Sequence, residues 1–271
     1  MILVNIGCGA VFHPAWINLD SAPVAVEVRA LDARGPLPFA DASVDAVYHA
    51  HLLEHLEAED ARRFLAECHR ILRPGGVIRV VVPDLEGIAQ AYLREMAAVR
   101  AGGDATLYDW ARLELLDQAA RSRSGGNMRP FLTRLTAPQV ARVRTRAGAE
   151  TDAILAMASP RRRRAPGWGK IWLRVRRELA RILLLGLGGR RMQGAFDEGW
   201  FRQGGEVHRV MYDEVSLGRL LRACGFAELR KTTAVESRIP GYAGYELDAM
   251  AGVARKPDSL YLEAVRPAGG R

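Results

Sequence analysis

One short segment constrains the fold of this chain more than any other. Residues 77–82, Val-Ile-Arg-Val-Val-Val, are the run richest in β-branched side chains. They follow residues 57–72, whose apolar positions recur at helical spacing, and the breaker Pro74-Gly75-Gly76 separates the two. A helix that leads into an apolar strand predicts a β-α-β unit. We therefore expect 77–82 to be a central, buried strand of a largely parallel sheet.

Apolar runs on both sides of this unit predict the rest of the sheet. Before it, we expect short strands over 2–6, 16–19, 24–28 and 44–50. After it, we expect helices over 85–100 and 213–224 and strands over 227–235 and 259–265. The last two strands follow a helix, which is typical of an antiparallel pair at a sheet edge. Too few residues separate Gly9 from Trp16 for a crossover helix, so an irregular loop must join the first two strands.

Composition excludes several classes of protein. Of the 271 residues, 49% are hydrophobic and 26% are charged, values typical of a globular chain rather than a disordered one. The three cysteines are far apart and form no CxxC motif, which favours a reduced, cytoplasmic protein. No apolar run approaches the roughly 18 residues of a membrane span. No basic segment precedes the first apolar run, so we expect no signal peptide.

The middle of the chain differs from both ends. Helical stretches there are broken by Gly and Pro, and strand signals are missing. Residues 121–192 contain 18 Arg or Lys but only 3 Asp or Glu, and include the run 161–164 of four Arg. We expect a core over 1–104, a helical, Arg-rich insertion over 105–205 that forms a lid or acceptor site, and the C-terminal part of the core sheet over 206–271. Clustered cations predict an acidic partner, such as a phosphate-bearing substrate or an anionic membrane.

Three ligand-type groups follow successive strands. Gly7-Cys8-Gly9 permits a sharp turn and close approach of a ligand, although a simple turn explains it equally well. Phe12 stands where a dinucleotide fingerprint needs glycine, which disfavours nicotinamide and flavin dinucleotides. Asp20 could accept hydrogen bonds from a ribose diol or cap a turn, and Asp32 could accept from an adenine amino group. Leu37-Pro38-Phe39 is a candidate to pack on the purine.

Together these groups resemble the class I S-adenosylmethionine-dependent methyltransferases. The likeness is carried by Val4-Asn5-Ile6-Gly7-Cys8-Gly9, Leu37-Pro38-Phe39-Ala40-Asp41-Ala42-Ser43-Val44-Asp45, Leu53-Glu54-His55-Leu56 and Arg70-Ile71-Leu72-Arg73-Pro74-Gly75-Gly76. It covers residues 2–101 well and 206–266 more loosely, and it is closest to predicted methyltransferases associated with surface-glycan biosynthesis. The resemblance implies an α/β fold: a Rossmann-like, seven-stranded methyltransferase sheet with an antiparallel last strand, here with a helical insertion.

The resemblance also implies S-adenosylmethionine as cofactor. The positions that match its binding residues are Gly7, Cys8 and Gly9 on the methionine side, Asp20 at the ribose, Asp32 and Ala33 at the adenine, and His51 beside the methyl-transfer site. Two departures stand out. Asn5 replaces the aspartate that many relatives carry, and the missing first helix changes how the glycine loop is braced.

A cluster of histidines supplies the candidate catalytic residues. His51, Glu54 and His208 are predicted to be catalytic, with His51 as general base on a sugar hydroxyl and Glu54 orienting it or binding substrate. We expect His55 to be buried and structural. His208 is either a pocket residue beneath a lid of Phe201, Arg202 and Glu206 or a surface histidine. A metal site built from His51, Glu54 and His208 is disfavoured because zinc-type spacing is missing, so no metal is predicted.

Residues 168–187 predict a basic amphipathic helix. Its apolar stripe comprises Ile171, Trp172, Val175, Leu179, Ile182 and Leu183, and its basic side comprises Arg174, Arg176, Arg177 and Arg181. Such a helix either packs on the body with its Arg residues in solvent or lies peripherally on an anionic membrane, at the inner face for a cytoplasmic protein. A nucleic-acid partner is disfavoured because the aromatic residues form no stacking surface.

The predicted function is transfer of a methyl group to a small-molecule or glycan acceptor, with a hydroxyl of a sugar or phosphate-bearing saccharide favoured. Two alternatives remain. The first is a membrane-surface assembly factor that binds S-adenosylmethionine without transferring its methyl group. The second is a nucleic-acid methyltransferase, which Ala50-His51-Leu52-Leu53 argues against, because base N-methylation typically uses an Asn/Asp-Pro-Pro-aromatic motif there.

Overall fold

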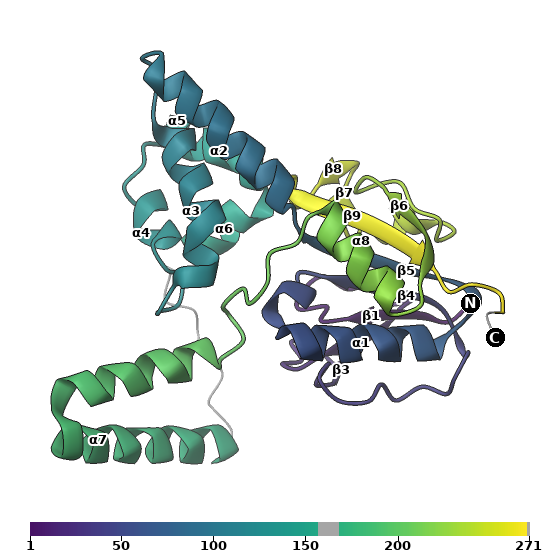
Figure 1. Ribbon diagram of the computed structural model, residues 1–271, viewed down its shortest axis with the longest axis horizontal. Helices are drawn as coiled ribbons and strands as arrows, with labels where there is room; N and C mark the ends of the chain where they lie inside the picture. Colours follow the sequence, from purple (N-terminus) through teal and green to yellow (C-terminus); the bar gives the residue numbers. More distant parts are fainter. Residues whose placement is uncertain (157–167, 270–271) are drawn as a thin grey trace.

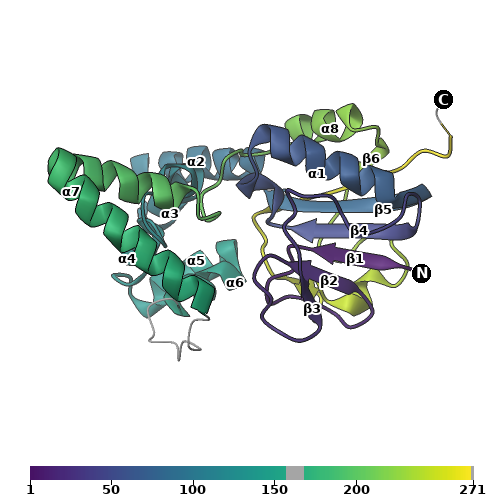
Figure 2. The same cartoon turned by 90° about the horizontal axis from the view of Figure 1, so that it is seen from below.

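The computed structural model describes residues 1–156 and 168–269, and a seven-stranded sheet forms its centre. The strands are β1 (Leu3–Ile6), β2 (Ile17–Asp20), β3 (Val28–Ala30), β4 (Val44–Ala50), β5 (Leu72–Pro83), β6 (Ala227–Lys231) and β9 (Ser259–Val265). Their order is β3-β2-β1-β4-β5-β9-β6, and Figure 2 shows β2, β1, β4 and β5 side by side. Strands β1 to β5 pair in parallel, and β9 is antiparallel to both β5 and β6. The predicted fold class is confirmed.

Two helices cover one face of this sheet. They are α1 (Ala58–Ile71) and α8 (Glu214–Ala223), which lie over the same face in Figure 1. Helix α1 buries its apolar stripe, including Phe64, Leu65 and Cys68, in the largest hydrophobic core. Helix α8 begins where the Asp213 carboxylate accepts a hydrogen bond from the Ser216 amide at 2.7 Å. Such capping fixes the helix start.

The opposite face is covered mainly by loops. Residues 232–258 contain the short helix η2 (Tyr242–Tyr245) and a ribbon formed by β7 (Ala249–Met250) and β8 (Val253–Ala254). A second hydrophobic core lies between this loop and the sheet, and in it Trp16, Tyr48 and Tyr242 pack edge to face or tilted. The guanidinium of Arg79 is buried beneath the loop and pairs with Asp248 at 2.8 Å and Glu263 at 3.0 Å.

The chain between β5 and α8 is helical in its described residues. It comprises α2 (Leu85–Arg100), α3 (Thr106–Ala120), α4 (Met128–Leu132), α5 (Ala137–Ala147), α6 (Ala149–Ala156) and α7 (Trp168–Arg202). Helices α3 to α6 enclose a separate small core that includes Trp110, Met128 and Val143. None of the helices in 1–156 and 168–269 is long and apolar enough to cross a membrane.

Helix α7 is a hairpin that stands apart from the sheet in both ribbon views (Figures 1 and 2). Its two limbs meet at Gly189, whose φ of +66° is non-helical. Arg177 and Arg181 face the returning limb, where both pair with Asp197, at 3.2 and 3.0 Å. The apolar stripe faces solvent instead: Leu179 is 61% and Ile182 66% exposed. The expectation that this stripe packs on the body is therefore wrong.

Two predicted strands differ from those in the structure. The third begins only at Val28, because residues 24–27 form bends and turns and leave Val26 96% exposed. The strand expected over 227–235 ends at Lys231, where the chain leaves the sheet edge to build the loop over the second core. The loop expected between β1 and β2 is confirmed, since residues 7–16 contain no helix. The predicted Arg run 161–164 lies outside the described residues.

Candidate functional site

The carboxyl ends of β1, β2 and β4 meet at one edge of the sheet, where a cavity of about 420 Å³ opens. We call it the Asp20 cavity. Its lining includes five of the residues predicted to bind cofactor: Gly7, Asp20, Asp32, Ala33 and His51. Parallel strands place ligand-binding loops at this edge in open α/β sheets. The geometry therefore brings together groups that lie far apart in the sequence.

The glycine loop leaves open space on one side. Gly7 has a φ of +71°, and its amide donates to the Leu19 carbonyl at 2.8 Å. A Cβ added at Gly7 would lie 3.1 Å from the Leu52 side chain, whereas one added at Gly9 would meet nothing within 4 Å. Gly7 is thus required by its backbone angle and by Leu52, and Gly9 leaves room for a ligand to approach the main chain.

Asp20 caps the turn that follows β2, and its predicted role at a ribose stays a prediction. One carboxylate oxygen accepts from the Gly9 amide at 2.8 Å, and the other accepts from the Ala22 amide at 2.7 Å. It therefore braces the glycine loop, which has no following helix. Each ionised oxygen has further acceptor capacity, so the carboxylate can still receive hydroxyl donors from the cavity.

Asp32 and the residues after it lie differently from expectation. The Asp32 carboxylate pairs with Arg34 at 2.7 Å, and this hydrogen bond lowers the pKa of Asp32. An adenine amino group would share that carboxylate with Arg34. Leu37 is buried in the main core and Phe39 packs against it, so the expectation that this segment stacks on a purine is wrong for Leu37 and unsupported for Phe39.

A second cavity of about 350 Å³ adjoins the first, and we call it the Lys256 cavity. Gly7 and His51 line both cavities. The second is also lined by Cys8, Gly9, Val11, Tyr48, Asp248, Lys256 and Tyr261, and by Ala149, Glu150 and Ala153 of α6. Burial raises the pKa of the Cys8 thiol to about 11, so Cys8 is a small neutral group here.

His51 stands at the junction of the cavities in a constrained conformation. Its φ is +51°, which is uncommon for a non-glycine residue. Its Nδ1 lies 3.1 Å from Glu54 Oε1, and its Nε2 lies 3.1 Å from Ser259 Oγ. Burial and the charge of Lys256 lower the pKa of His51 despite Glu54. A neutral ring that donates from Nδ1 to Glu54 has a basic Nε2.

Glu54 is wholly buried beneath His51. Burial alone would raise its pKa, but the hydrogen bond from His51 and the nearby histidines outweigh it and lower the pKa to about 2. Glu54 is therefore ionised at neutral pH. This arrangement fits its predicted role of orienting His51, because an anionic partner fixes the tautomer of the ring.

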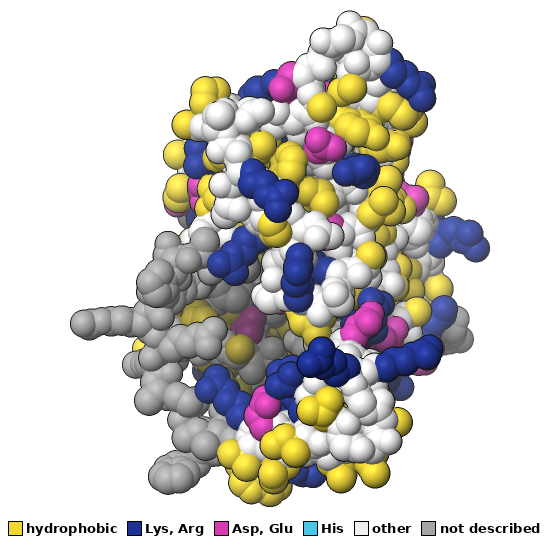
Figure 3. Space-filling model, turned by 90° about the vertical axis from the view of Figure 1, so that its left-hand side faces the viewer, with side chains coloured by type: hydrophobic (Ala, Val, Ile, Leu, Met, Phe, Trp, Pro, Cys, Tyr) yellow, Lys and Arg dark blue, Asp and Glu magenta, His cyan; other side chains and the backbone are white. Residues whose placement is uncertain are grey.

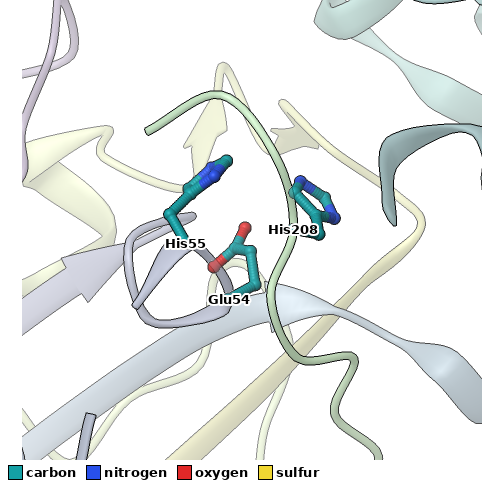
Figure 4. Close-up of side chains that lie close together, drawn as sticks. All are labelled: Glu54, His55 and His208. Atoms are coloured by element: carbon teal, nitrogen blue, oxygen red, sulfur yellow. The ribbon is translucent and has the colours of Figure 1, made fainter. Parts of the chain in front are cut away.

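His208 is buried rather than on the surface, but it lines neither of these two cavities. Its ring lies 4.8 Å from that of His55, centroid to centroid, and beside Glu54 (Figure 4). The expected lid also differs. Residues 203–205 and Arg209 line the Asp20 cavity, whereas Glu206 is held to the insertion by Arg121 at 3.1 Å. A catalytic role for His208 stays a prediction.

Sequence reasoning missed several residues of the site. Ser259 meets His51 although 208 positions separate them. Glu150 and Lys256 form an ion pair at 3.5 Å in the wall of the second cavity. Lys256 carried a weak signal, since it is one of only three lysines in an Arg-rich chain. Glu150 carried none, because only the fold brings α6 to the sheet.

Residues 8–80 match the family model of the methyltransferase domain. A "Probable S-adenosylmethionine-dependent methyltransferase" of Mycolicibacterium smegmatis is 50% identical over 76 residues, which is 25% of this chain and 28% of that protein. This chain therefore matches little more than a quarter of that relative's length.

Solved structures give more distant likenesses. A SAM-dependent methyltransferase from Archaeoglobus fulgidus has a TM-score of 0.38 and 11% identity, covering 97% of this chain and 85% of that one. A SAM-dependent methyltransferase from Thermotoga maritima has a TM-score of 0.38 and 13% identity, covering 98% and 82%. The part of the chain that carries Asp20 and most of the glycine loop is thus similar to a methyltransferase domain.

Proposed function

We propose that this chain transfers a methyl group from S-adenosylmethionine to a hydroxyl of a saccharide or other small acceptor, in particular one that bears phosphate. The observation that carries the proposal is the junction at His51, where the Asp20 and Lys256 cavities share two lining residues. The first cavity suits the cofactor because Gly7, Asp20 and Asp32 line it. Bound there, it supplies an already activated methyl group.

His51 can remove the acceptor's proton. With Nδ1–H directed at Glu54, its Nε2 accepts a hydrogen bond from the Ser259 hydroxyl. An acceptor hydroxyl that replaces Ser259 at Nε2 would pass its proton to this nitrogen. Its oxygen would then take up the activated methyl group that bound S-adenosylmethionine would supply, with S-adenosylhomocysteine as the leaving product. The ionised Glu54 stabilises the resulting imidazolium.

The Lys256 cavity supports the acceptor class. Tyr48 and Tyr261 offer aromatic walls, and Lys256 with Arg255 offers positive charge. Glu150 reaches the same wall from α6 and pairs with Lys256. Aromatic faces beside a few polar groups are typical of small-molecule sites, and cations suit phosphate.

Calorimetric titration with S-adenosylhomocysteine tests the cofactor site. We expect micromolar binding by the wild type and at least tenfold weaker binding by Asp20→Ala, because charge-assisted hydrogen bonds each contribute about 1.5–3 kcal/mol. His13→Gln, which changes a histidine that lines neither cavity, is the control. A folded wild type that does not bind would refute the proposal.

The acceptor step needs its own test. With a panel of nucleotide sugars and lipid-linked saccharides, His51→Ala should lose turnover while it retains S-adenosylhomocysteine binding. If His51→Ala turns over as fast as the wild type, His51 is not the base. If only acceptors without phosphate react, the role proposed for Lys256 is wrong.

The α7 hairpin supports a peripheral membrane contact in addition. Exposed apolar residues, among them Trp172, Leu179 and Ile182, lie beside Arg174 and Arg176, and the guanidinium of Arg176 lies over the Trp172 ring at 4.6 Å. Figure 3 views the left-hand side of the molecule in Figure 1, and hydrophobic and basic side chains lie next to one another in its lower part. Apolar side chains flanked by Arg are the chemistry of an anionic bilayer interface. The side chains of 168–171 lie outside the described residues.

Vesicle co-sedimentation separates this contact from the catalytic proposal. Vesicles rich in phosphatidylglycerol should bind the wild type, neutral phosphatidylcholine vesicles should bind it less, and Ile182→Glu with Leu179→Glu should abolish binding. Val215→Glu changes an equally exposed apolar residue on α8 and should have no effect. The alternative, an assembly factor without transferase activity, requires His51→Ala to be harmless in cells while deletion of the hairpin is not.

A further inference from the structure

Three side chains with metal-binding atoms converge behind the Asp20 cavity (Figure 4). Glu54 and His55 come from the short helix η1 (Leu53–His55), and His208 comes from the segment that follows α7. Each offers one ligand atom, and these atoms all lie within 4.8 Å of one another. Contributions from two separate parts of the chain make this a tertiary arrangement rather than a local turn.

Two polar atoms of this cluster are buried without a partner. Glu54 Oε2 and His208 Nδ1 have no hydrogen-bond partner among the described residues. Glu54 is 0% and His208 6% exposed. A buried polar atom without a partner destabilises the fold, and a charged one does so more strongly. A bound cation would satisfy both atoms at once.

The surrounding contacts orient the three ligands. His55 Nδ1 lies 3.3 Å from the Val207 carbonyl, which leaves its Nε2 free for a ligand. Glu54 Oε1 accepts from His51, which leaves Oε2 free. The backbone of His208 donates to the Gln118 carbonyl at 3.1 Å and so fixes the segment. Metal-binding histidines almost always donate their other ring N–H to an oxygen, as His55 can here.

We propose that Glu54, His55 and His208 bind a divalent first-row transition-metal ion, with Zn²⁺ as its simplest representative. Two histidines and one carboxylate are a common donor set for Zn²⁺ and Fe²⁺ and leave coordination positions open for water or a substrate oxygen. Ligand atoms of tetrahedral zinc lie about 3.3 Å apart, so binding draws the three side chains together by rotation.

This site differs from the metal site of His51, Glu54 and His208 that the sequence disfavoured, because His55 takes the place of His51. His51 acts instead as the outer partner that holds Glu54. Glu54 Oε2 and His208 Nδ1, which have no partner in the described part of the chain, are both buried in this cluster. Because His55 lines the Asp20 cavity, the ion would stand beside the space assigned to the cofactor.

The test uses the full chain stripped with a chelator. Calorimetry with ZnCl₂ should show one ion per chain, and Co²⁺ should give visible d–d absorption typical of a nitrogen- and oxygen-ligated site. His208→Gln and His55→Gln should each weaken binding at least 100-fold, whereas His13→Gln should bind as the wild type does. Zn²⁺ should also raise the melting temperature of the wild type but not of His208→Gln.

Several outcomes would overturn the proposal. These are no saturable Zn²⁺ binding by a folded wild type, or equal affinity in the wild type and both histidine variants. Because His208→Gln could unfold, circular dichroism and the milder His55→Gln accompany it. S-adenosylhomocysteine binding is measured on the same chelated samples. If it persists while metal binding fails, the metal site alone is refuted and the methyltransferase proposal stands.

Discussion

Replacement of Arg79 by Met tests how the loop-covered face of the sheet is held. The guanidinium is fully buried and donates five hydrogen bonds, to Asp248, Glu263, Thr232 and the carbonyls of Glu236 and Thr233. Its removal leaves two carboxylates without their counter-charge. Breaking one buried ion pair costs about 3–5 kcal/mol. With both pairs lost, we expect Arg79→Met to cost at least about 4 kcal/mol, a large part of a typical stability of about 5–15 kcal/mol.

Urea denaturation followed by circular dichroism measures this cost. The exposed Arg230, on the edge strand, provides a matched control, and Arg230→Met should change stability by less than about 0.5 kcal/mol. Adding Asp248→Asn and Glu263→Gln to Arg79→Met removes the stranded charges and should restore at least half of the loss. A cost below about 1 kcal/mol, or no rescue by the neutral variants, would refute the reasoning. Because Asp248 lines the Lys256 cavity, acceptor binding should fall in parallel.

Three further predictions concern other parts of the fold. Gly7→Ala should lower stability by about 1–3 kcal/mol, because the φ of Gly7 is +71° and Leu52 lies 3.1 Å from the added Cβ; urea titration measures this loss. The same variant should lose S-adenosylhomocysteine binding, which calorimetry measures. Burial lowers the pKa of His49 from 6.5 to about 4, so the unfolded chain takes up a proton at a higher pH than the folded chain does. The free energy of unfolding therefore falls as the pH drops from 6.5 to 4, by about 3 kcal/mol at pH 4. In His49→Leu that part of the pH dependence should vanish from urea titrations. Asp213→Ala should cost about 1 kcal/mol through loss of the α8 cap, and an unchanged melting temperature would contradict this.

The sheet could be predicted because its signals are local. Glycine and proline mark the ends of buried runs, and the helical spacing before β5 is regular. The same reasoning failed at residues 24–27, where Val24 and Val26 alternate like a strand but are 58% and 96% exposed. Alternation shows that two side chains share a side, not that a partner strand is present. The ribbon β7–β8 has strands of two residues, too short to leave a periodic signal.

The site was predictable only where it follows strand ends. Gly7, Asp20 and His51 each follow or end a parallel strand, and such strands end at one sheet edge. Ser259 and Glu150 come from distant segments that only tertiary folding brings to His51 and Lys256. The apolar stripe of α7 was also visible in the sequence, but periodicity cannot tell whether a stripe faces the core or the solvent.

A short stretch of chain connects the α7 hairpin directly to the wall of the Asp20 cavity. Helix α7 ends at Arg202, and residues 203–205 already line the cavity. No helix or strand lies between the hairpin and this wall, so a tilt of the hairpin would act on the wall directly through residues 203–205. If docking of the hairpin on a surface changes cofactor affinity by some factor, thermodynamic reciprocity requires that the cofactor change surface affinity by the same factor. The fraction of the protein bound to the surface would then change with the concentration of S-adenosylmethionine.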